Sequence, residues 1–200
     1  LYNCLFSVIR MIKLERTEQA VSFMEHLAHY FQFITRNAKE TVRIEDEIAH
    51  ARHYSVLQLA RFSDRITVEF SEVPDDIRGF EVPRLILQPI VENAFLHGLE
   101  DRLENGVLRV RVTSSIDRVV IDVEDNGNNG ESEVAKMNRI LETPNEGSEV
   151  TAILNVHRRL KYKYGEPSGL SISRSELGGV KVSMTIRREE KLDEPNAYRG

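Results

Sequence analysis

The spacing of apolar residues changes near residue 64, and this change constrains the fold of the chain more than any other feature. Residues 1–64 contain neither glycine nor proline, and their apolar residues recur every three or four positions, which predicts helices. A polar stretch over residues 36–43 predicts a turn between two of them. The apolar stripe before this turn comprises Ala20, Met24, Leu27, Phe31 and Ile34, and the stripe after it comprises Ile44, Ile48, Ala51, Ser55, Leu59 and Phe62.

After residue 64 the apolar residues alternate instead. Over residues 65–71 every second residue is apolar, which is typical of a strand with one buried face. Pro83 suits the first turn of a later helix, and Gly98 suits its end. Further strands are predicted over residues 107–112, 119–123, 170–173 and 180–186, and helices over residues 83–98, 132–141 and 150–164. We therefore predict an α+β fold, in which a mainly antiparallel sheet carries helices on one face.

These patterns divide the chain into a helical region over residues 1–64, a sheet domain over residues 65–188 and a charged tail over residues 189–200. Two antiparallel amphipathic helices cannot bury both of their apolar faces alone. Either two copies of the chain pair as a four-helix bundle, or the helical hairpin packs on the sheet domain of its own chain. We predict the homodimer, and the second arrangement stays open.

The composition excludes several classes of protein. The net charge of −5 over 200 residues gives no reason to expect a nucleic-acid partner. A single cysteine, Cys4, excludes an internal disulfide and fits a reducing compartment. No run approaches the roughly 18 apolar residues of a membrane helix. Because the chain opens without a start methionine, we expect it to be part of a longer protein, for which a membrane anchor upstream stays open.

For function, the most informative segment is residues 87–98, which read Leu-Gln-Pro-Ile-Val-Glu-Asn-Ala-Phe-Leu-His-Gly. Asn93 stands in an otherwise apolar helix, where an amide without a partner is costly, and His97 lies one turn further along the same surface. Magnesium binds few protein oxygens together with substrate phosphates, so the amide oxygen of Asn93 suits a nucleotide-bound magnesium ion. An asparagine that bonds to a neighbouring loop explains this single residue as well or better.

Two later segments suit the rest of a nucleotide. Asp125 ends a predicted strand, and its ionised carboxylate can receive the exocyclic amine of a purine, while Gly127 allows a close backbone approach. Asn155 and Arg159 stand near the start of a predicted helix, where free N–H groups and fixed positive charge favour phosphates. Taken singly, Asp-Asn-Gly is a common turn, and a pair of arginines is usually a solvated helix face.

In their order and spacing, the three segments resemble those of sensor histidine kinases of the LytS/YesM branch. The N-box of that family, Gln-Pro-x-x-Glu-Asn-Ala-x-x-His-Gly, matches residues 88–98, its Asp-x-Gly element matches residues 125–127, and its Asn-x-x-x-Arg-Leu element matches residues 155–160. The resemblance implies a Bergerat-type α/β sandwich that follows a dimeric four-helix bundle and binds ATP and Mg²⁺. It assigns catalysis to Glu92 and Asn93, the metal to Asn93, and nucleotide contacts to Asn93, His97, Asp125, Gly127, Asn155 and Arg159.

The resemblance also implies a reaction and its partners. Members of the family autophosphorylate on a histidine and pass the phosphoryl group to a response regulator, here expected to be of the LytTR or AraC type, on the cytoplasmic side of the plasma membrane. Residues 1–5 match the second half of their phosphoacceptor motif, which places the histidine two residues before Leu1. ATP-hydrolysing relatives carry a glutamate four residues before the magnesium asparagine, whereas this chain has Pro89 there. The sequence therefore argues against a simple ATPase.

The chain departs from the family pattern in the segments expected around the phosphates. Asn129 replaces the second glycine of the first glycine box, residues 150–153 lack both glycines of the expected phosphate lid, and Val180 replaces a threonine. Side chains at lid positions hinder close backbone approach and mobility, so we expect weak ATP binding. The alternative hypothesis is a degenerate, non-catalytic module that dimerises with or regulates another kinase.

Overall fold

The computed structural model describes residues 2–35, 40–62, 65–128, 130–142 and 152–188. Its helices are α1 (Tyr2–Lys13), α2 (Thr17–Thr35), α3 (Ile44–Leu59), α4 (Gln88–Asn93), α5 (Gly130–Glu142) and α6 (Ala152–Tyr164), with the 3₁₀ helix η1 (Asp75–Ile77) and the π-helix η2 (Ala94–Leu99), which continues α4. Its strands are β1 (Thr41–Arg43), β2 (Ile66–Phe70), β3 (Glu81–Pro83), β4 (Gly106–Ser114), β5 (Arg118–Asp125), β6 (Gly169–Arg174) and β7 (Val180–Arg187).

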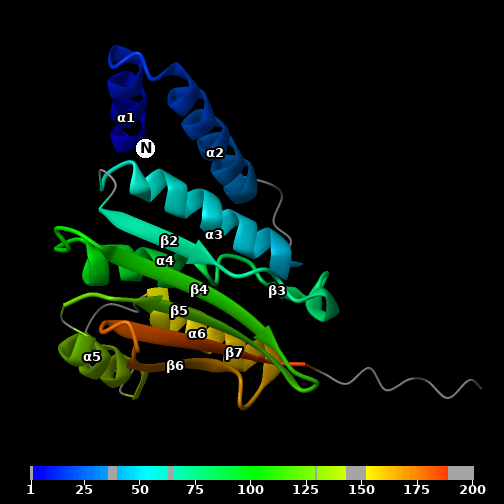
Figure 1. Cartoon of the computed structure of the whole chain (residues 1–200). Helices are drawn as coiled ribbons and strands as arrows, with labels where there is room; N and C mark the ends of the chain where they lie inside the picture. Colours follow the sequence, from blue (N-terminus) through cyan, green and yellow to red (C-terminus); the bar gives the residue numbers. More distant parts are fainter. Residues whose placement is uncertain (1, 36–39, 63–64, 129, 143–151, 189–200) are drawn as a thin grey trace, which may run out of the picture.

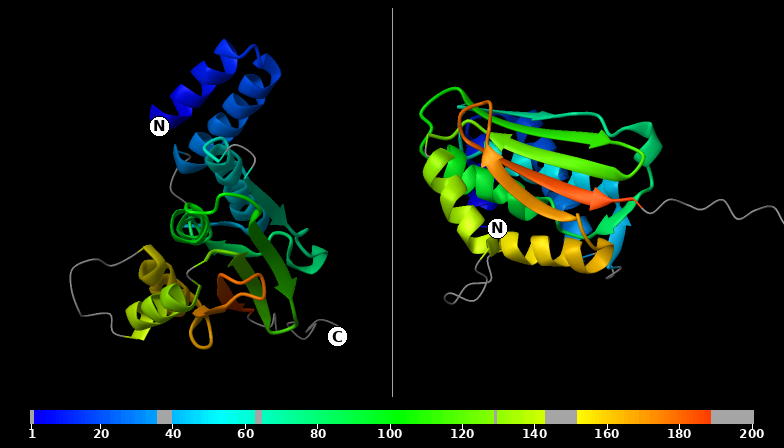
Figure 2. Two further views of the ribbon diagram at one scale, coloured as in Figure 1. Left: turned by 60° about the vertical axis from the view of Figure 1, so that its left-hand side comes forward. Right: turned by 90° about the horizontal axis from the view of Figure 1, so that it is seen from below.

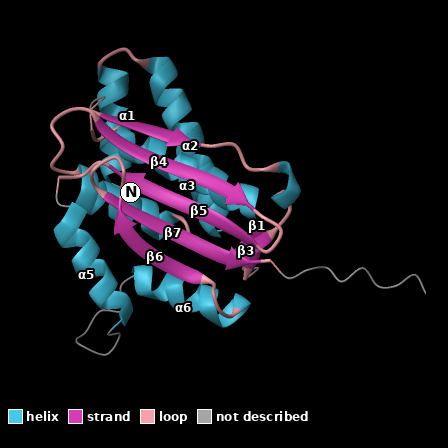
Figure 3. Ribbon diagram, turned by 60° about the horizontal axis from the view of Figure 1, so that its bottom comes forward, coloured by secondary structure: helices cyan, strands magenta, loops and turns pink. Residues whose placement is uncertain are grey.

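Within these residues, five strands form one sheet in the order β2-β4-β5-β7-β6. β2 and β4 pair in parallel, and the other neighbouring strands of this sheet are antiparallel. The helices lie behind the sheet in Figure 3, and α3, α4, α5 and α6 share one apolar core with its strands. The predicted α+β fold, with a mainly antiparallel sheet and helices on one face, is therefore confirmed.

Burial alternates along the strands as the sequence predicts. In β7, Val182 and Met184 point into the core, whereas Ser183 between them is only partly covered. On the opposite face of the sheet, Arg109 of β4 forms an ion pair of 2.8 Å with Glu69 of β2, and the two residues are register partners. This face therefore carries polar side chains, of which Asp122 and Glu124 of β5 are buried, and the apolar core lies on the helical side.

Helix α3 packs against the sheet rather than in a separate bundle with α1 and α2. Ile44, Ile48, Ala51 and Tyr54 of α3 are buried in the same apolar core as the strands. In Figure 1, α3 lies between α2 and the sheet, and α1 and α2 extend beyond it. The domain division that we predict at residue 64 separates α3 from the strands with which it shares this core. The apolar stripe of α3, which we assign to a helix–helix seam, faces the sheet instead.

Helices α1 and α2 form one end of the molecule, as Figure 2 shows. A small second core joins Phe23 and Leu27 of α2 to Leu57 of α3. Large apolar side chains that are exposed on α1 and α2 are Leu5, Phe6, Ile9, Ile12, Val21, Met24, Phe31 and Ile34. Of the five residues in the stripe predicted for α2, only Ala20 and Leu27 are buried within one chain. An exposed apolar surface of this kind marks a site of protein contact, and the homodimer stays a prediction.

A break that the sequence does not announce separates α1 from α2. α1 ends at Lys13, and Glu15 adopts a φ of 59° before α2 begins at Thr17. Residues in this left-handed region are usually glycine or asparagine. The segment between α1 and α2 has neither, so the helices predicted before residue 36 do not include this break. Of the turn predicted over residues 36–43, residues 41–43 form β1, which pairs with β3, and residues 36–39 lie outside the described part of the chain.

The helix predicted over residues 83–98 begins later than the sequence suggests. Pro83 ends β3, and α4 begins at Gln88 with Pro89 in its first turn. The prediction is wrong here because either proline fits a first helical turn, and only the pairing of β3 with β1 decides between them. The other predicted strands and helices match the structure to within two residues where it describes them.

Two further predictions concern the ends of the chain and the membrane. The charged tail predicted over residues 189–200 lies outside the described residues. Among the helices that the structure describes, none is both long enough and apolar enough to cross a membrane.

Candidate functional site

The N-box helix runs through the core and presents Asn93 at its edge. Ile90, Val91 and Phe95 are buried, whereas Asn93 is half-buried and Glu92 is exposed. The amide nitrogen of Asn93 lies 3.7 Å from the sulfur of Met137 on α5. Among the described residues, none donates a hydrogen bond to the Asn93 side-chain oxygen. The bond to a neighbouring loop that would explain Asn93 structurally is therefore absent from the described part of the chain.

A buried carboxylate holds the turn from which this helix starts. Glu47 of α3 is fully buried, and its two oxygens accept hydrogen bonds from the backbone N–H groups of Leu85, Ile86 and Leu87 at 3.0, 2.8 and 2.9 Å. Burial raises the pKa of Glu47, while the three N–H donors and the charge of Arg159 act in the opposite direction. Glu47 thus fixes the N-terminal end of α4 to α3.

We did not predict Glu47 from the sequence, although a signal for it exists. It lies three residues after Ile44 and four before Ala51, which places a carboxylate on the apolar face of its helix. Lone buried carboxylates are rare and need hydrogen-bond donors. The donors, however, lie 38–40 residues further along the chain, and no spacing rule connects them to Glu47.

Asp125 ends β5 and is almost completely buried. Its Oδ1 accepts hydrogen bonds from the backbone N–H groups of Gly127 and Val180 at 2.8 and 3.2 Å, and burial raises its pKa. No described residue donates a hydrogen bond to its Oδ2. One oxygen of Asp125 therefore fixes the carboxylate, and the other is free to accept a hydrogen bond from a ligand.

Close packing explains the glycines around Asp125. A Cβ atom at Gly98 would lie 2.6 Å from the carboxylate carbon of Asp125, and one at Gly127 would lie 2.5 Å from the carbonyl oxygen of Gly98. Gly98 thus brings the end of the N-box against Asp125 and does not serve as a helix stop, since η2 continues to Leu99. The close approach of the Gly98 backbone is sufficient to explain why position 127 needs a glycine. The approach of Gly127 to a purine stays a prediction.

Helix α6 contributes Arg159 to the turn before α4. The Arg159 side chain is half-buried, and its Nη2 donates a hydrogen bond of 2.6 Å to the backbone carbonyl of Arg84, just before the turn that Glu47 holds. Arg159 is therefore not a solvated surface residue. Asn155 and His97 are exposed, and their predicted contacts with nucleotide stay predictions.

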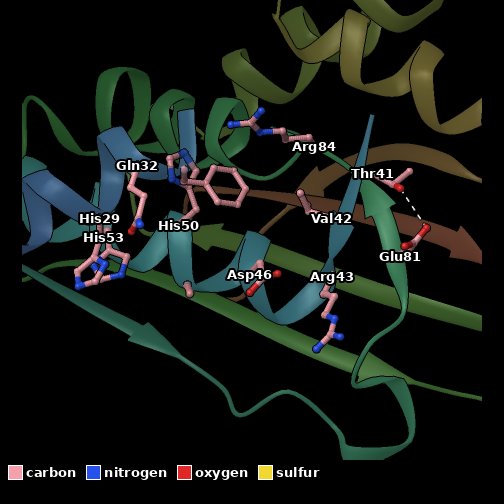
Figure 4. A pocket seen from close by; sticks show the side chains of 12 residues that line it. His29, Gln32, Thr41, Val42, Arg43, Asp46, His50, His53, Glu81 and Arg84 are labelled. Carbon is pink, nitrogen blue, oxygen red and sulfur yellow. Dashed lines mark hydrogen bonds between the residues drawn. The ribbon is translucent and has the colours of Figure 1, made fainter. Parts of the chain in front are cut away.

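A cavity of about 660 Å³ lies elsewhere, between α2, α3 and the small β1–β3 sheet. Figure 4 shows His29, Gln32, His50 and Arg84 around it. None of the predicted site residues lines this cavity. Burial and the neighbouring His26, His29 and His50 lower the pKa of His53, which also lines it, to about 4. The cavity is therefore distinct from the region that brings Gly98, Asp125 and Gly127 together.

Comparisons with known proteins agree with these motifs. The family model described as histidine kinase matches residues 1–66. Sensor histidine kinase YesM of Bacillus subtilis is 30% identical over 186 residues, which are 93% of this chain and 31% of YesM. Sensor histidine kinase YpdA of Escherichia coli is 32% identical over 89% of this chain and 30% of its own length. Sensor protein LytS of Enterococcus faecalis is 28% identical over 96% of this chain and 33% of its own length.

The chain thus spans about a third of the length of these curated relatives. Among solved structures, the catalytic domain of histidine kinase ThkA matches 74% of this chain with a TM-score of 0.51 and 15% identity, over 93% of its own length. At that identity the likeness concerns the fold alone, and it agrees with the mixed architecture described above. On the evidence of the motifs, the relatives and the fold, the chain belongs to the histidine kinase family, in the group of sensor kinases that includes YesM and LytS.

Proposed function

We propose that this chain is the catalytic fragment of a two-component sensor histidine kinase and that it binds Mg²⁺-ATP between Asn93 and Asp125. One observation carries the proposal. Each of these half-buried or buried polar side chains has one oxygen that receives no hydrogen bond from a described residue. Gly98 packs against Asp125 and belongs to the same motif as Asn93. Two oxygen acceptors of this kind suit an ion with its phosphates and a purine amine.

The donor set fits both groups. Asn93 supplies a neutral hard oxygen, as magnesium requires when phosphates provide most of its ligands, and the ion neutralises phosphate charge. Asp125 Oδ2 accepts the purine amine, and Arg159 adds fixed positive charge near the start of α4. The assigned nucleotide contacts of His97, Gly127 and Asn155 belong to this proposal as well.

The proposed reaction is phosphoryl transfer to the histidine of the phosphoacceptor motif that residues 1–5 continue. The unprotonated ring nitrogen attacks the γ-phosphorus in line, and the bond from that phosphorus to the bridging oxygen of ADP breaks. Glu92 is exposed one residue before Asn93, and we assign it to orient the imidazole or to accept the proton from its other nitrogen. The phosphoryl group then passes to a response regulator, which we expect to be of the LytTR or AraC type in a membrane-anchored parent protein.

The alternative, a regulatory module with little or no ATP binding, is favoured by a specific contact. Asn93 meets the Met137 sulfur, an unusual neighbour for a magnesium ligand, since thioethers are soft and magnesium is hard. In addition, Val180 serves Asp125 through its backbone N–H group and offers no hydroxyl.

Calorimetry with Mg²⁺ and a nonhydrolysable ATP analogue separates the two hypotheses. For the kinase we expect saturable heat below millimolar ligand, and for the regulatory module no heat up to that concentration. A protein extended upstream to include the motif histidine should also acquire an acid-labile label from labelled ATP. Binding without any such label would retain the nucleotide site and reject the transfer reaction.

The exposed apolar surface of α1 and α2 supports pairing with a second copy of the chain. Phe6 is 68% exposed on α1, and burying such residues against an equivalent helix pair completes a four-helix bundle. We expect Phe6→Glu to weaken dimerisation at least about tenfold, because a charge buried without a partner is costly. Sedimentation equilibrium measures the change. Ile116→Glu is the matched control, since Ile116 is 82% exposed outside these helices, and equal dimerisation of both variants would contradict the assignment.

A further inference from the structure

Gln88 opens the N-box, yet both ends of its amide are used by helices outside that motif. Its Nε2 donates a hydrogen bond of 3.1 Å to the hydroxyl oxygen of Tyr30 on α2. Its Oε1 lies 2.8 Å from Nε2 of His50 on α3 and, as a carbonyl oxygen, accepts a hydrogen bond from the imidazole N–H there. Gln88 therefore joins three elements that meet only in the tertiary structure.

His50, which bonds to Gln88, is itself held between α2 and α3 by stacking. The side chain is buried, and its ring stacks on Tyr30, with ring centroids 5.0 Å apart, and on Phe33, with centroids 4.1 Å apart. Burial lowers the pKa of His50, so the ring is neutral at pH 7 and its protonated Nε2 faces Gln88. Two aromatic residues one turn apart on α2 thus hold the histidine that orients Gln88.

A second connection runs beside the first. The guanidinium of Arg84 lies 5.0 Å from the centroid of the Phe33 ring, within cation–π range. The backbone carbonyl of Arg84 in turn accepts the hydrogen bond from Arg159 of α6. The same turn of α2 that reaches Gln88 therefore also reaches a residue of the proposed nucleotide site.

We infer that Gln88 is a positioning residue through which α2 sets the placement of Asn93. The inference rests on the proposed function, because it concerns nucleotide binding at Asn93. Gln88 is the first residue of α4 and Asn93 is the last, so one short helix carries both. Glu47 fixes only the backbone turn before the helix, whereas the Tyr30–Gln88 bond is a side-chain hydrogen bond that joins α2 directly to α4.

The test uses Tyr30→Phe, which removes the hydroxyl and keeps the stacked ring, Gln88→Met, which removes the amide, and the double variant. Tyr162→Phe is the matched control, because Tyr162 is 96% exposed. We expect Tyr30→Phe and Gln88→Met each to weaken Mg²⁺-ATP binding in calorimetry about fivefold, within the usual range of coupling between sites. The double variant should bind no more weakly than Gln88→Met alone, since Gln88→Met already breaks the Tyr30–Gln88 bond that Tyr30→Phe removes.

Linkage supplies a readout that a merely structural role would not move. If α2 affects ATP affinity, ATP must stabilise the α2 contact by the same factor. Mg²⁺-ATP should therefore slow backbone hydrogen exchange over residues 30–35 in the wild type and not in Gln88→Met. Unchanged ATP affinity of Tyr30→Phe, or independent effects in the double variant, would overturn the inference while the wild type still binds ATP. A wild type that binds no Mg²⁺-ATP would reject the proposed function and this inference together.

Discussion

Asn93→Ala is expected to weaken Mg²⁺-ATP binding by about 100-fold or more and to leave the unfolding temperature of the free protein nearly unchanged. The side-chain oxygen of Asn93 accepts no hydrogen bond from a described residue, and its nitrogen has only a weak contact with Met137. The fold therefore loses little when the amide is removed, whereas a metal site with few protein ligands loses one of them.

A thermal-shift titration measures both effects in one experiment. Ligand at 100 times its dissociation constant stabilises the native state by about 2.7 kcal/mol, and Asn93→Ala should lose this gain. Asn138→Ala is the matched control, because Asn138 is also a half-buried asparagine but donates its hydrogen bond to the carbonyl of Ile172. This control should be less stable than the wild type and retain the ligand-induced shift.

Asp125→Asn separates the two halves of the site. With magnesium removed by chelator, ADP should still bind to Asn93→Ala, whose change affects only the metal ligand, and should not bind to Asp125→Asn. An asparagine at position 125 presents an amide nitrogen where Asp125 has an acceptor oxygen. If both variants lost metal-free ADP binding equally, the division of roles between Asn93 and Asp125 would be wrong.

Glu47→Ala is expected to destabilise the protein by about 3–5 kcal/mol, because it leaves three backbone N–H groups without their partner in a buried turn. For a chain of this size, this loss lowers the unfolding temperature by roughly 10 °C. Chemical denaturation measures the free energy directly, provided that the slope of the transition is unchanged.

Two controls isolate the cause of that loss. Glu45→Ala also removes a carboxylate that accepts a backbone hydrogen bond, from Gly79, but Glu45 is only half-buried, so about 1 kcal/mol or less is expected. Glu47→Gln keeps the shape of the side chain and one acceptor oxygen, so its loss in free energy of unfolding should lie between those of Glu47→Ala and Glu45→Ala. A loss for Glu47→Ala as small as that for Glu45→Ala would show that water or another group replaces the carboxylate.

Local patterns were sufficient to predict the strands of the five-stranded sheet. A strand with one buried face needs an apolar residue at every second position, and β7 shows this pattern directly. The spacing from Gln88 to Gly98 likewise identified the segment that ends against Asp125. The boundary errors have a different origin, because Pro83 and Pro89 are equally suited to a helix start and only the pairing of β1 with β3 distinguishes them.

The sequence alone therefore determines the five strands of the large sheet, most of the helices and the segments that carry polar groups, since these features depend on neighbours within a few positions. Other features depend on side chains that meet from distant parts of the chain: α3 joins the core of the sheet, Glu47 holds the turn before α4, and Gln88 faces Tyr30 and His50. Their energies come from burial and from hydrogen bonds made in an apolar interior, and that interior exists only once the chain has folded.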